Sequence, residues 1–144
     1  MRELRLNITS DPARLAPARR TVEAFCQGCG FDDKAVADIG LVVNEAIANI
    51  TRHAYGGATD QPIKLHASFS QDNTLRLCIR DWGSGRDPRT DSGRRDPLTP
   101  GGLGMVCLRS LMDEVTFTPK PDGMLLTMSR AIGTGRGADS VSAS

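Results

Sequence analysis

The sequence predicts an α/β fold of the α+β kind, a two-layer α/β sandwich in which helices cover one face of a mixed, mostly antiparallel sheet. Three observations support this prediction. Apolar residues alternate with polar ones in five segments, the period of a half-buried strand, and recur at intervals of three and four in three others, the period of a helix. The segments follow the order strand, helix, helix, strand, strand, helix, strand, strand. Turn residues separate the strands of two consecutive pairs, as in hairpins.

The first strand and the first helix lie at the N-terminus. Apolar and polar residues alternate over residues 4–8, which predicts a strand. The Ser-Asp-Pro sequence of residues 10–12 then gives a helix N-cap followed by a proline in the first turn. Apolar residues at helical spacing extend this helix to Cys29, and we expect Gly28 and Gly30 to end it.

The second helix follows at once. Asp32 and Asp33 supply its N-terminal cap, and apolar residues recur at intervals of three and four from Val36 to Ile50. A tyrosine followed by two glycines, residues 55–57, predicts its end.

The remaining segments form two hairpins with a helix between them. Alternation over residues 63–69 and 75–79 predicts the first hairpin, and residues 115–117 and 124–128 predict the second. A short helix is expected over residues 104–112. The turns fall at residues 71–73 and 121–123, which are rich in Asp, Asn, Pro and Gly.

Length and composition favour one domain. The chain has 144 residues, enough for a single domain to bury roughly 70% of the surface that its unfolded chain exposes. We assign residues 1–131 to this domain and expect residues 132–144, where Gly, Ser and Ala dominate, to form a disordered tail. With 18 basic and 17 acidic side chains the formal charge is +1, so we expect no nucleic-acid partner.

The location of the protein follows from what the chain lacks. We expect no membrane association and a cytoplasmic location, because there is no apolar run near the ~20 residues of a membrane span and no apolar signal segment at the start. The four cysteines, at positions 26, 29, 78 and 107, include one pair with the two-residue gap of a zinc site. A second close pair is missing, so core thiols are the favoured interpretation over zinc.

Polar residues form a stripe on the second predicted helix. Glu45 and Asn49 are four residues apart and lie one above the other, between apolar stripes. A carboxylate and an amide oxygen suit Mg²⁺ with its waters. Arg52 and His53 extend the stripe toward the helix end. The alternative is that Glu45 simply points into solvent, because one stripe of an amphipathic helix is always polar.

Two glycine-containing motifs follow. Asp81 ends a predicted strand and leads into Gly83 and Gly85, where the backbone allows a ligand to approach closely. A second cluster, residues 101–104 (Gly-Gly-Leu-Gly), opens the third helix, and backbone N–H groups at a helix N-terminus suit phosphate. The segment between Asp81 and this helix has no apolar period, and we expect it to be a functional lid.

The order of the three motifs is specific. Glu-x-x-x-Asn on a helix, Asp-x-Gly-x-Gly after a strand and Gly-x-Gly opening a helix resemble the N, G1 and G2 boxes of the GHKL ATP-binding superfamily. The resemblance spans about residues 1–131 and implies a sandwich of the GHKL (Bergerat) type. Within that superfamily, residues 44–49 (Asn-Glu-Ala-x-x-Asn) and 111–115 (Leu-Met-Asp-Glu-Val) look like those of the anti-sigma-factor serine kinases.

This resemblance implies a role for each motif, with ATP and Mg²⁺ as cofactors. Asn49 would coordinate the Mg²⁺ that bridges the ATP phosphates, and Glu45 would be the general base toward a serine hydroxyl. Asp81 would accept a hydrogen bond from the exocyclic amine of adenine. Arg52 and His53 would be either phosphate contacts or ordinary residues of a helix end. Gly83 and Gly85 would let the backbone approach the base, and the phosphates would be contacted by Gly101, Gly102, Leu103 and Gly104.

The resemblance also implies partners. Such kinases sequester a sigma factor and phosphorylate a serine on a small anti-sigma-factor antagonist, a STAS-domain protein, and they are cytoplasmic homodimers. Arg19 on the first helix is a candidate for the sigma-binding face, and the favoured alternative is an ordinary surface arginine. The alternative function is a binding module that sequesters a partner and uses nucleotide without phosphorylating anything.

Overall fold

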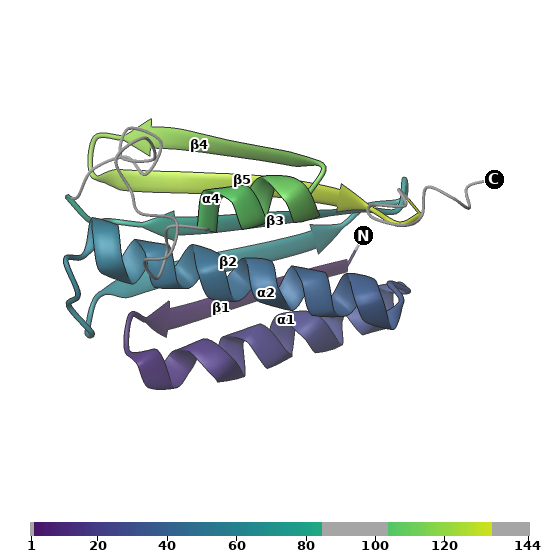
Figure 1. Cartoon of the computed structure of the whole chain (residues 1–144), viewed down its shortest axis with the longest axis horizontal. Helices are drawn as coiled ribbons and strands as arrows, with labels where there is room; N and C mark the ends of the chain where they lie inside the picture. The colour runs from purple at the N-terminus through teal and green to yellow at the C-terminus, as the bar shows by residue number, and fades with distance from the viewer. Residues whose placement is uncertain (1, 85–103, 134–144) are drawn as a thin grey trace.

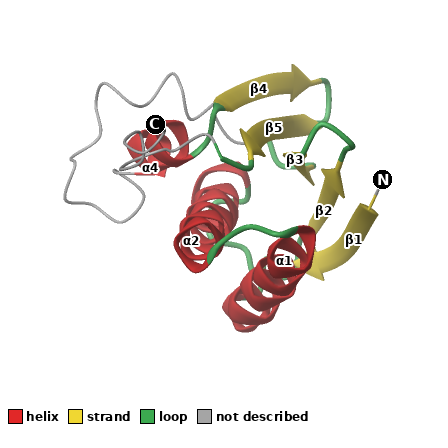
Figure 2. Cartoon of the chain, turned by 90° about the vertical axis from the view of Figure 1, so that its right-hand side faces the viewer, coloured by secondary structure: helices red, strands yellow, loops and turns green. Residues whose placement is uncertain are grey.

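The computed structural model describes residues 2–84 and 104–133, with side chains of the second range from residue 108 onward. It has two layers, a five-stranded sheet and a layer of helices packed on one of its faces (Figures 1 and 2). The predicted sandwich and the predicted order of its elements are therefore confirmed. The predicted tail lies outside the described residues from 134 onward, as does most of the predicted lid.

The sheet is antiparallel in every described strand pair rather than mixed. Its order is β1-β2-β3-β5-β4. Both predicted hairpins are present, and because β5 folds back between β3 and β4, those two strands are not neighbours. Short hairpin turns favour antiparallel neighbours, since parallel ones need a long crossover. The strands are β1 (Arg2–Thr9), β2 (Pro62–Phe69), β3 (Thr74–Asp81), β4 (Glu114–Lys120) and β5 (Gly123–Ala131).

The first helix is α1 (Leu15–Cys29), preceded by a short 3-10 turn, η1 (Pro12–Arg14), that Asp11 caps. Gly30 ends α1 in a left-handed conformation with φ of 107°, as predicted, and its N–H bonds back to the last turn. Gly28 was also predicted to end the helix, and this is wrong. It lies inside α1, because only the residue with a left-handed backbone can close the last turn.

Two further α-helices in the described residues are α2 (Asp33–Asn49) and α4 (Gly104–Leu111). Asp32 caps α2 as predicted, since its Oδ1 accepts a hydrogen bond of 2.8 Å from the backbone N–H of Ala35. Figure 2 shows α1, α2 and α4 on the same side of the sheet.

The core lies between the helices and the sheet. The alternate residues 63, 65 and 67 of β2 and 75, 77 and 79 of β3 are 1% exposed or less, which confirms the strand periodicity. Cys26 is among the buried residues, and burial raises the pKa of its thiol to about 12. The core-thiol prediction is thus confirmed for Cys26, whereas Cys29 and Cys78 are half-buried. The largest fully buried side chains of the described residues are Val22, Ile39, Val42, Val43, Ile63, Leu65, Leu75, Leu77, Ile79, Leu108, Met112 and Met128.

One buried ion pair ties α2 to β5 and α4. Arg130 is 6% exposed and donates from Nη1 to Asp38 Oδ2 at 3.2 Å and to the carbonyl of Leu111 at 3.1 Å. Lys34 also donates to Asp38, from the surface. This cluster fixes the first half of α2 against the end of α4.

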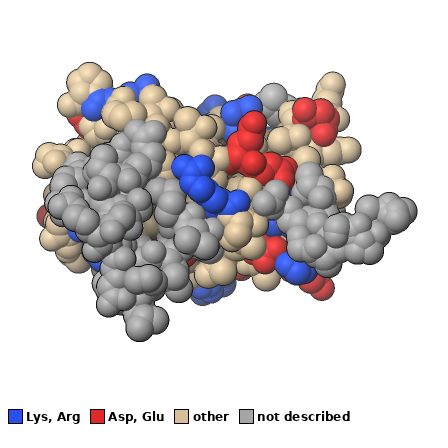
Figure 3. Space-filling view, turned by 45° about the horizontal axis from the view of Figure 1, so that its top comes forward, with Lys and Arg blue, Asp and Glu red and all other residues tan. Residues whose placement is uncertain are grey.

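The surface carries both signs of charge. Figure 3 shows basic and acidic side chains interspersed over the described part of one face, in keeping with the near-zero net charge. None of the helices in the described residues is long and apolar enough to cross a membrane.

Candidate functional site

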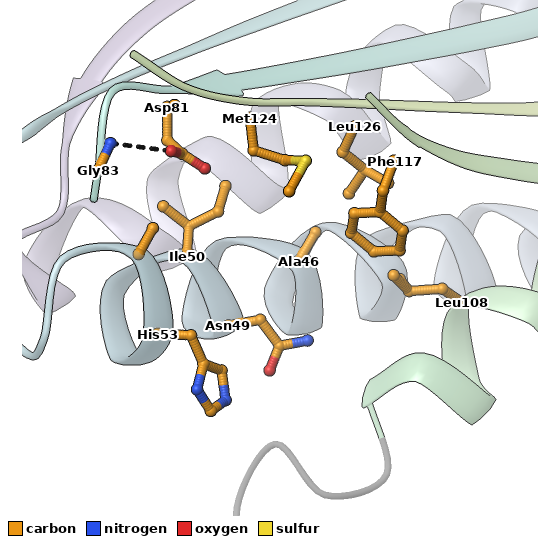
Figure 4. Close-up of a pocket in the computed structure, with 12 residues that line it drawn as sticks. Ala46, Asn49, Ile50, His53, Asp81, Gly83, Leu108, Phe117, Met124 and Leu126 are labelled. Atoms are coloured by element: carbon orange, nitrogen blue, oxygen red, sulfur yellow. Dashed lines mark hydrogen bonds between the residues drawn. The ribbon is translucent and has the colours of Figure 1, made fainter. Parts of the chain in front are cut away.

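A pocket opens where the end of α2 meets the end of β3 (Figure 4). Most of its lining is apolar, and its polar side chains within the described residues are Asn49, His53 and Asp81. An apolar cavity with a few well-placed polar groups is typical of a small-molecule site. The described lining is Ala46, Asn49, Ile50, His53, Ala54, Asp81, Gly83, Leu108, Phe117, Gly123, Met124 and Leu126.

The polar groups occupy different parts of this pocket. Figure 4 shows Ala46 of α2 and Ile50 of the turn after it pointing toward the strands, with Asp81 on the strand side. Asn49 at the end of α2 and His53 in the same turn point away from the strands. A ligand that reaches both groups must therefore have one polar end near the sheet and another near the outer side of α2.

Asp81 is the last residue of β3 and is only 3% exposed. Its Oδ1 accepts a hydrogen bond of 3.0 Å from the backbone N–H of Gly83. Burial raises the pKa of this carboxyl, partly offset by the N–H of Gly83, the charge of Arg80 and the N–H of Met124. An ionised carboxylate has about four acceptor positions, so Asp81 can also accept a hydrogen bond from a ligand.

The end of α2 is not a regular helix terminus. After Asn49 the chain continues as a π-helical turn, η2 (Ile50–Ala54), in which the N–H of Tyr55 donates to the carbonyl of Ile50 at 3.1 Å. Gly56 and Gly57, both with positive φ, then end the helical segment where the sequence predicted. Sequence reasoning missed the π-turn. Such turns are frequent at functional sites, and this one contributes three of the pocket residues.

Gly83 lies against this π-turn. A Cβ at position 83 would be 2.3 Å from the carbonyl oxygen of Ala54, closer than any real contact. Glycine is therefore required here by the approach of one backbone segment to the other, in addition to any approach of a ligand.

Asn49 and Arg52 interact with each other. The Nη2 of Arg52 donates to Oδ1 of Asn49 at 2.9 Å, while the Nε of Arg52 is buried without a partner among the described residues. Arg52 does not line the pocket itself. No group of three or more His, Cys, Asp or Glu side chains gathers in the described parts of the chain. A cation here would thus have Asn49 as one oxygen ligand and would need the rest from ligand and water, which fits Mg²⁺ better than zinc.

Glu45 lies one helical turn before Asn49, about 6 Å along the helix axis. It is half-buried and is not part of the described pocket lining. Next to it, Asn44 has a buried Oδ1 without a described partner.

The structure thus brings together four of the predicted site residues, Asn49, His53, Asp81 and Gly83. Gly104 begins α4, and Gly85, Gly101, Gly102 and Leu103 lie outside the described residues. Sequence reasoning missed most of the apolar lining. The strand alternation marked Phe117, Met124 and Leu126 as inward-facing, but core and pocket positions have the same pattern.

The site combines a buried carboxylate at a strand end, an amide at the end of a facing helix and an apolar floor, an arrangement suited to a small-molecule ligand. Comparison with known proteins identifies the family. The chain belongs to the histidine kinase-like ATPase domain family, which it matches over residues 8–130. Membership of this family implies that the chain binds ATP.

Several relatives are similar along most of the chain. The serine-protein kinase RsbW of Listeria innocua is 26% identical over 139 residues, 90% of this chain and 87% of the relative. The anti-sigma F factor of Halalkalibacterium halodurans is 29% identical over 124 residues, 83% of this chain and 84% of the relative.

A solved structure has the same fold. The RsbU and RsbW domains of Rv1364c from Mycobacterium tuberculosis superpose on 91% of this chain with a TM-score of 0.69 and 19% identity. This chain spans 32% of that longer protein.

Proposed function

We propose that this protein is an ATP-dependent serine protein kinase and anti-sigma factor. It sequesters a sigma factor or a similar client and phosphorylates a serine of its anti-sigma-factor antagonist, a STAS-domain protein. The main support is that Asp81 and Asn49, from two different elements, line one pocket while Glu45 lies one helical turn from Asn49. The names of the relatives, serine-protein kinase and anti-sigma F factor, agree with this function.

Asp81 recognises the base in this proposal. Its carboxylate accepts a hydrogen bond from the exocyclic amine of adenine, whereas the carbonyl that guanine has at that position would be repelled. The apolar side chains around it cover the faces of the ring. Gly83 and Gly85 leave room for the base, and Gly101, Gly102, Leu103 and Gly104 supply backbone contacts to the phosphates.

Asn49 and its neighbours serve the phosphate end of the nucleotide. Asn49 Oδ1 would hold Mg²⁺, which would neutralise phosphate charge during transfer. That oxygen already accepts a hydrogen bond from Arg52, whose buried Nε has no partner among the described residues. Arg52 and His53 therefore stand close to the phosphates, where positive charge and N–H donors are useful.

Glu45 is the general base. It takes the proton of the serine hydroxyl as the serine oxygen attacks the γ-phosphorus, while the bond from that phosphorus to the bridging oxygen breaks and ADP leaves. The products are phosphoserine on the antagonist and ADP. Because Glu45 lies on the same helix as Asn49, one turn away, the distance between the base and the metal ligand is fixed.

The partner surfaces belong to the rest of the molecule. Arg19 on α1 is the proposed contact for the sigma factor, and its Nε lies 3.6 Å from the carboxylate of Glu23. We also propose a homodimer in the cytoplasm. One observation favours the alternative of a nucleotide-dependent binding module without kinase activity: Glu45 is not part of the described pocket lining.

Phosphoryl transfer to the antagonist separates the two functions. The wild type, Glu45→Ala and Glu23→Ala are incubated with γ-labelled ATP, Mg²⁺ and a STAS-domain antagonist from the same organism. The kinase labels a serine of the antagonist, Glu45→Ala reduces the rate at least about 100-fold, and Glu23→Ala, a control on the neighbouring helix, does not.

Two outcomes would contradict parts of this proposal. Binding of ATP by the wild type without any labelled antagonist would replace the kinase by the binding module. Labelling that is undiminished in Glu45→Ala would retain the kinase but remove Glu45 as its base.

A further inference from the structure

The only tyrosine of the chain connects three segments next to the pocket. Tyr55 follows the π-turn at the end of α2, and its hydroxyl donates to the carbonyl of Pro62 at the start of β2. The same hydroxyl accepts a hydrogen bond of 2.8 Å from the backbone N–H of Trp82. Trp82 is the residue directly after Asp81, so Tyr55 holds the backbone on which the buried carboxylate depends.

Two consecutive N–H groups fix the corner after β3. The N–H of Trp82 binds Tyr55, and the N–H of Gly83 binds Oδ1 of Asp81. Gly83 is also in close contact with the backbone of Ala54. The N–H of Gly83 holds the Asp81 carboxylate, and the hydroxyl of Tyr55 holds the peptide between Asp81 and Trp82, so Tyr55 acts on the backbone that carries the carboxylate.

The environment of Tyr55 suits this role. The side chain is half-buried, and burial raises the pKa of its hydroxyl, which the N–H of Trp82 partly offsets. The hydroxyl is therefore protonated at neutral pH and can donate to Pro62 while it accepts from Trp82. Tyr55 does not line the pocket within the described residues, so any effect on a ligand passes through Asp81.

We propose that Tyr55 is a positioning residue for base selectivity: it sets the preference for a 6-amino purine over a 6-oxo purine by holding the Asp81–Gly83 corner. This proposal rests on the proposed role of Asp81 in recognising adenine. Tyr55 itself touches neither base nor phosphate. Loss of its hydroxyl leaves the Trp82 N–H without this acceptor and lets the carboxylate reorient, so that it discriminates less between an amine and a carbonyl.

Ser10 provides a matched control. It is 2% exposed, and its hydroxyl donates to the carbonyl of Ala58 at 2.6 Å and accepts from the N–H of Gln61 at 3.1 Å. Like Tyr55, it joins two backbone groups of the connection between α2 and β2. Within the described residues, the hydrogen bonds of Ser10 go to Ala58 and Gln61 and do not reach the corner at residues 81–83.

The test measures dissociation constants for ATP and for inosine triphosphate, which has a carbonyl in place of the 6-amine. Isothermal titration calorimetry is performed with Mg²⁺ on the full chain, for the wild type, Tyr55→Phe, Ser10→Ala and Asp81→Asn. The dissociation constant for inosine triphosphate divided by that for ATP gives the selectivity for the 6-amine independently of overall affinity. We expect Tyr55→Phe to lower the ratio about fivefold, and Ser10→Ala to leave it unchanged although both variants have a lower Tm.

The remaining outcomes distinguish the proposed role of Tyr55 from the proposed role of Asp81. A wild-type ratio in Tyr55→Phe, with a lowered Tm, would make Tyr55 merely structural. An equal fall in Ser10→Ala would show that the connection as a whole, rather than Tyr55, sets selectivity. If Asp81→Asn keeps the wild-type ratio, the adenine role of Asp81 fails first and the role of Tyr55 fails with it.

A second variant covers the case in which Tyr55→Phe does not fold. Because Tyr55 is the only tyrosine, replacement of all tyrosine by a fluorotyrosine changes this hydroxyl alone. Fluorine makes the phenol oxygen a weaker acceptor while every atom of the connection remains. The ratio should fall in the same direction by a smaller factor, and an unchanged ratio in this protein would overturn the proposal.

Discussion

The two ends of α2 differ in how their polar groups are used. At the first end Asp32 caps the helix and Asp38 is bonded to Arg130, so these groups have partners within the protein. At the last end the Oδ1 of Asn44 and the Nε of Arg52 are buried without partners in the described part of the chain. The first end serves stability, and we interpret the last end as prepared for a ligand.

The magnitudes support this interpretation. A buried polar group without a partner costs about 1–3 kcal/mol. Two such groups within nine residues, the second of them inside the π-turn, are a large cost for a domain whose total stability is only about 5–15 kcal/mol. Strain of this kind persists where a function requires it. The difference teaches that one continuous helix can be a structural element at one end and a binding element at the other.

The largest expected effect comes from a substitution that removes a contact at the first, stabilising end of α2. Arg130→Ala leaves Asp38 half-buried with only the exposed Lys34 as a charged partner, and removal of one member of a buried ion pair costs about 3–5 kcal/mol. Chemical denaturation measures the loss. The affinity of the folded variant for ATP should equal that of the wild type.

Arg109→Ala, at an exposed arginine of α4, is the control and should change stability by less than about 0.5 kcal/mol. The double variant Arg130→Met, Asp38→Leu removes both charges and should recover most of the lost stability. A weaker affinity for ATP in the folded Arg130→Ala protein would contradict the division between the two ends of α2.

The next largest effect is expected from a substitution in the pocket at the last end of α2. Asp81→Asn keeps the shape of the side chain but removes its charge and one acceptor, and we expect the dissociation constant for ATP to rise about 10- to 100-fold. Calorimetric titration with ATP gives this number. Unchanged affinity would mean that the base lies elsewhere.

The same variant has the opposite effect on stability. Burial raises the pKa of Asp81, so the folded protein binds this proton more tightly than the unfolded chain does. The stability that Asp81 contributes is therefore present below its ordinary pKa and is lost as the pH rises through the raised pKa. At neutral pH the buried charge is unfavourable, and Asp81→Asn should have a higher Tm than the wild type. A lower Tm at neutral pH would contradict this, and thermal unfolding at acidic and neutral pH checks the sign.

The smallest effect concerns the cap of α2. Asp32→Ala removes the acceptor for the N–H of Ala35 and should lower stability by about 1 kcal/mol without changing the affinity for ATP. Asp33→Ala, at the neighbouring exposed position, removes charge but no cap and should cost at most about 0.5 kcal/mol. Equal losses in the two variants would show that charge, not the hydrogen bond, stabilises this end.

The features that could be predicted from the sequence are those that depend on residues close together in the chain. The alternation of apolar residues located the strands, and capping residues located the start of α2 at Asp32 and the end of α1 at Gly30. The spacing of Glu45 and Asn49 and the position of Asp81 located the candidate site, although the roles of these residues remain predictions.

What could not be predicted depends on contacts between distant segments. The π-turn, the approach of Gly83 to Ala54 and the double hydrogen bond of Tyr55 arise where the end of α2 meets the end of β3. No local sequence pattern encodes such a meeting. Gly28 shows the reverse case, in which a local signal for a helix end is overruled because the next glycine closes the turn.

Hydrogen exchange with and without ATP and Mg²⁺ tests the central claim most directly, because it reports both ends of α2 in one experiment. At saturating ATP, backbone amides of residues 49–57 and 82–83 should exchange more slowly, whereas those of residues 35–40 should be unchanged. Slower exchange confined to residues 35–40, or no change at either end of α2 while ATP is bound, would contradict the assignment of the ligand to the last end of this helix.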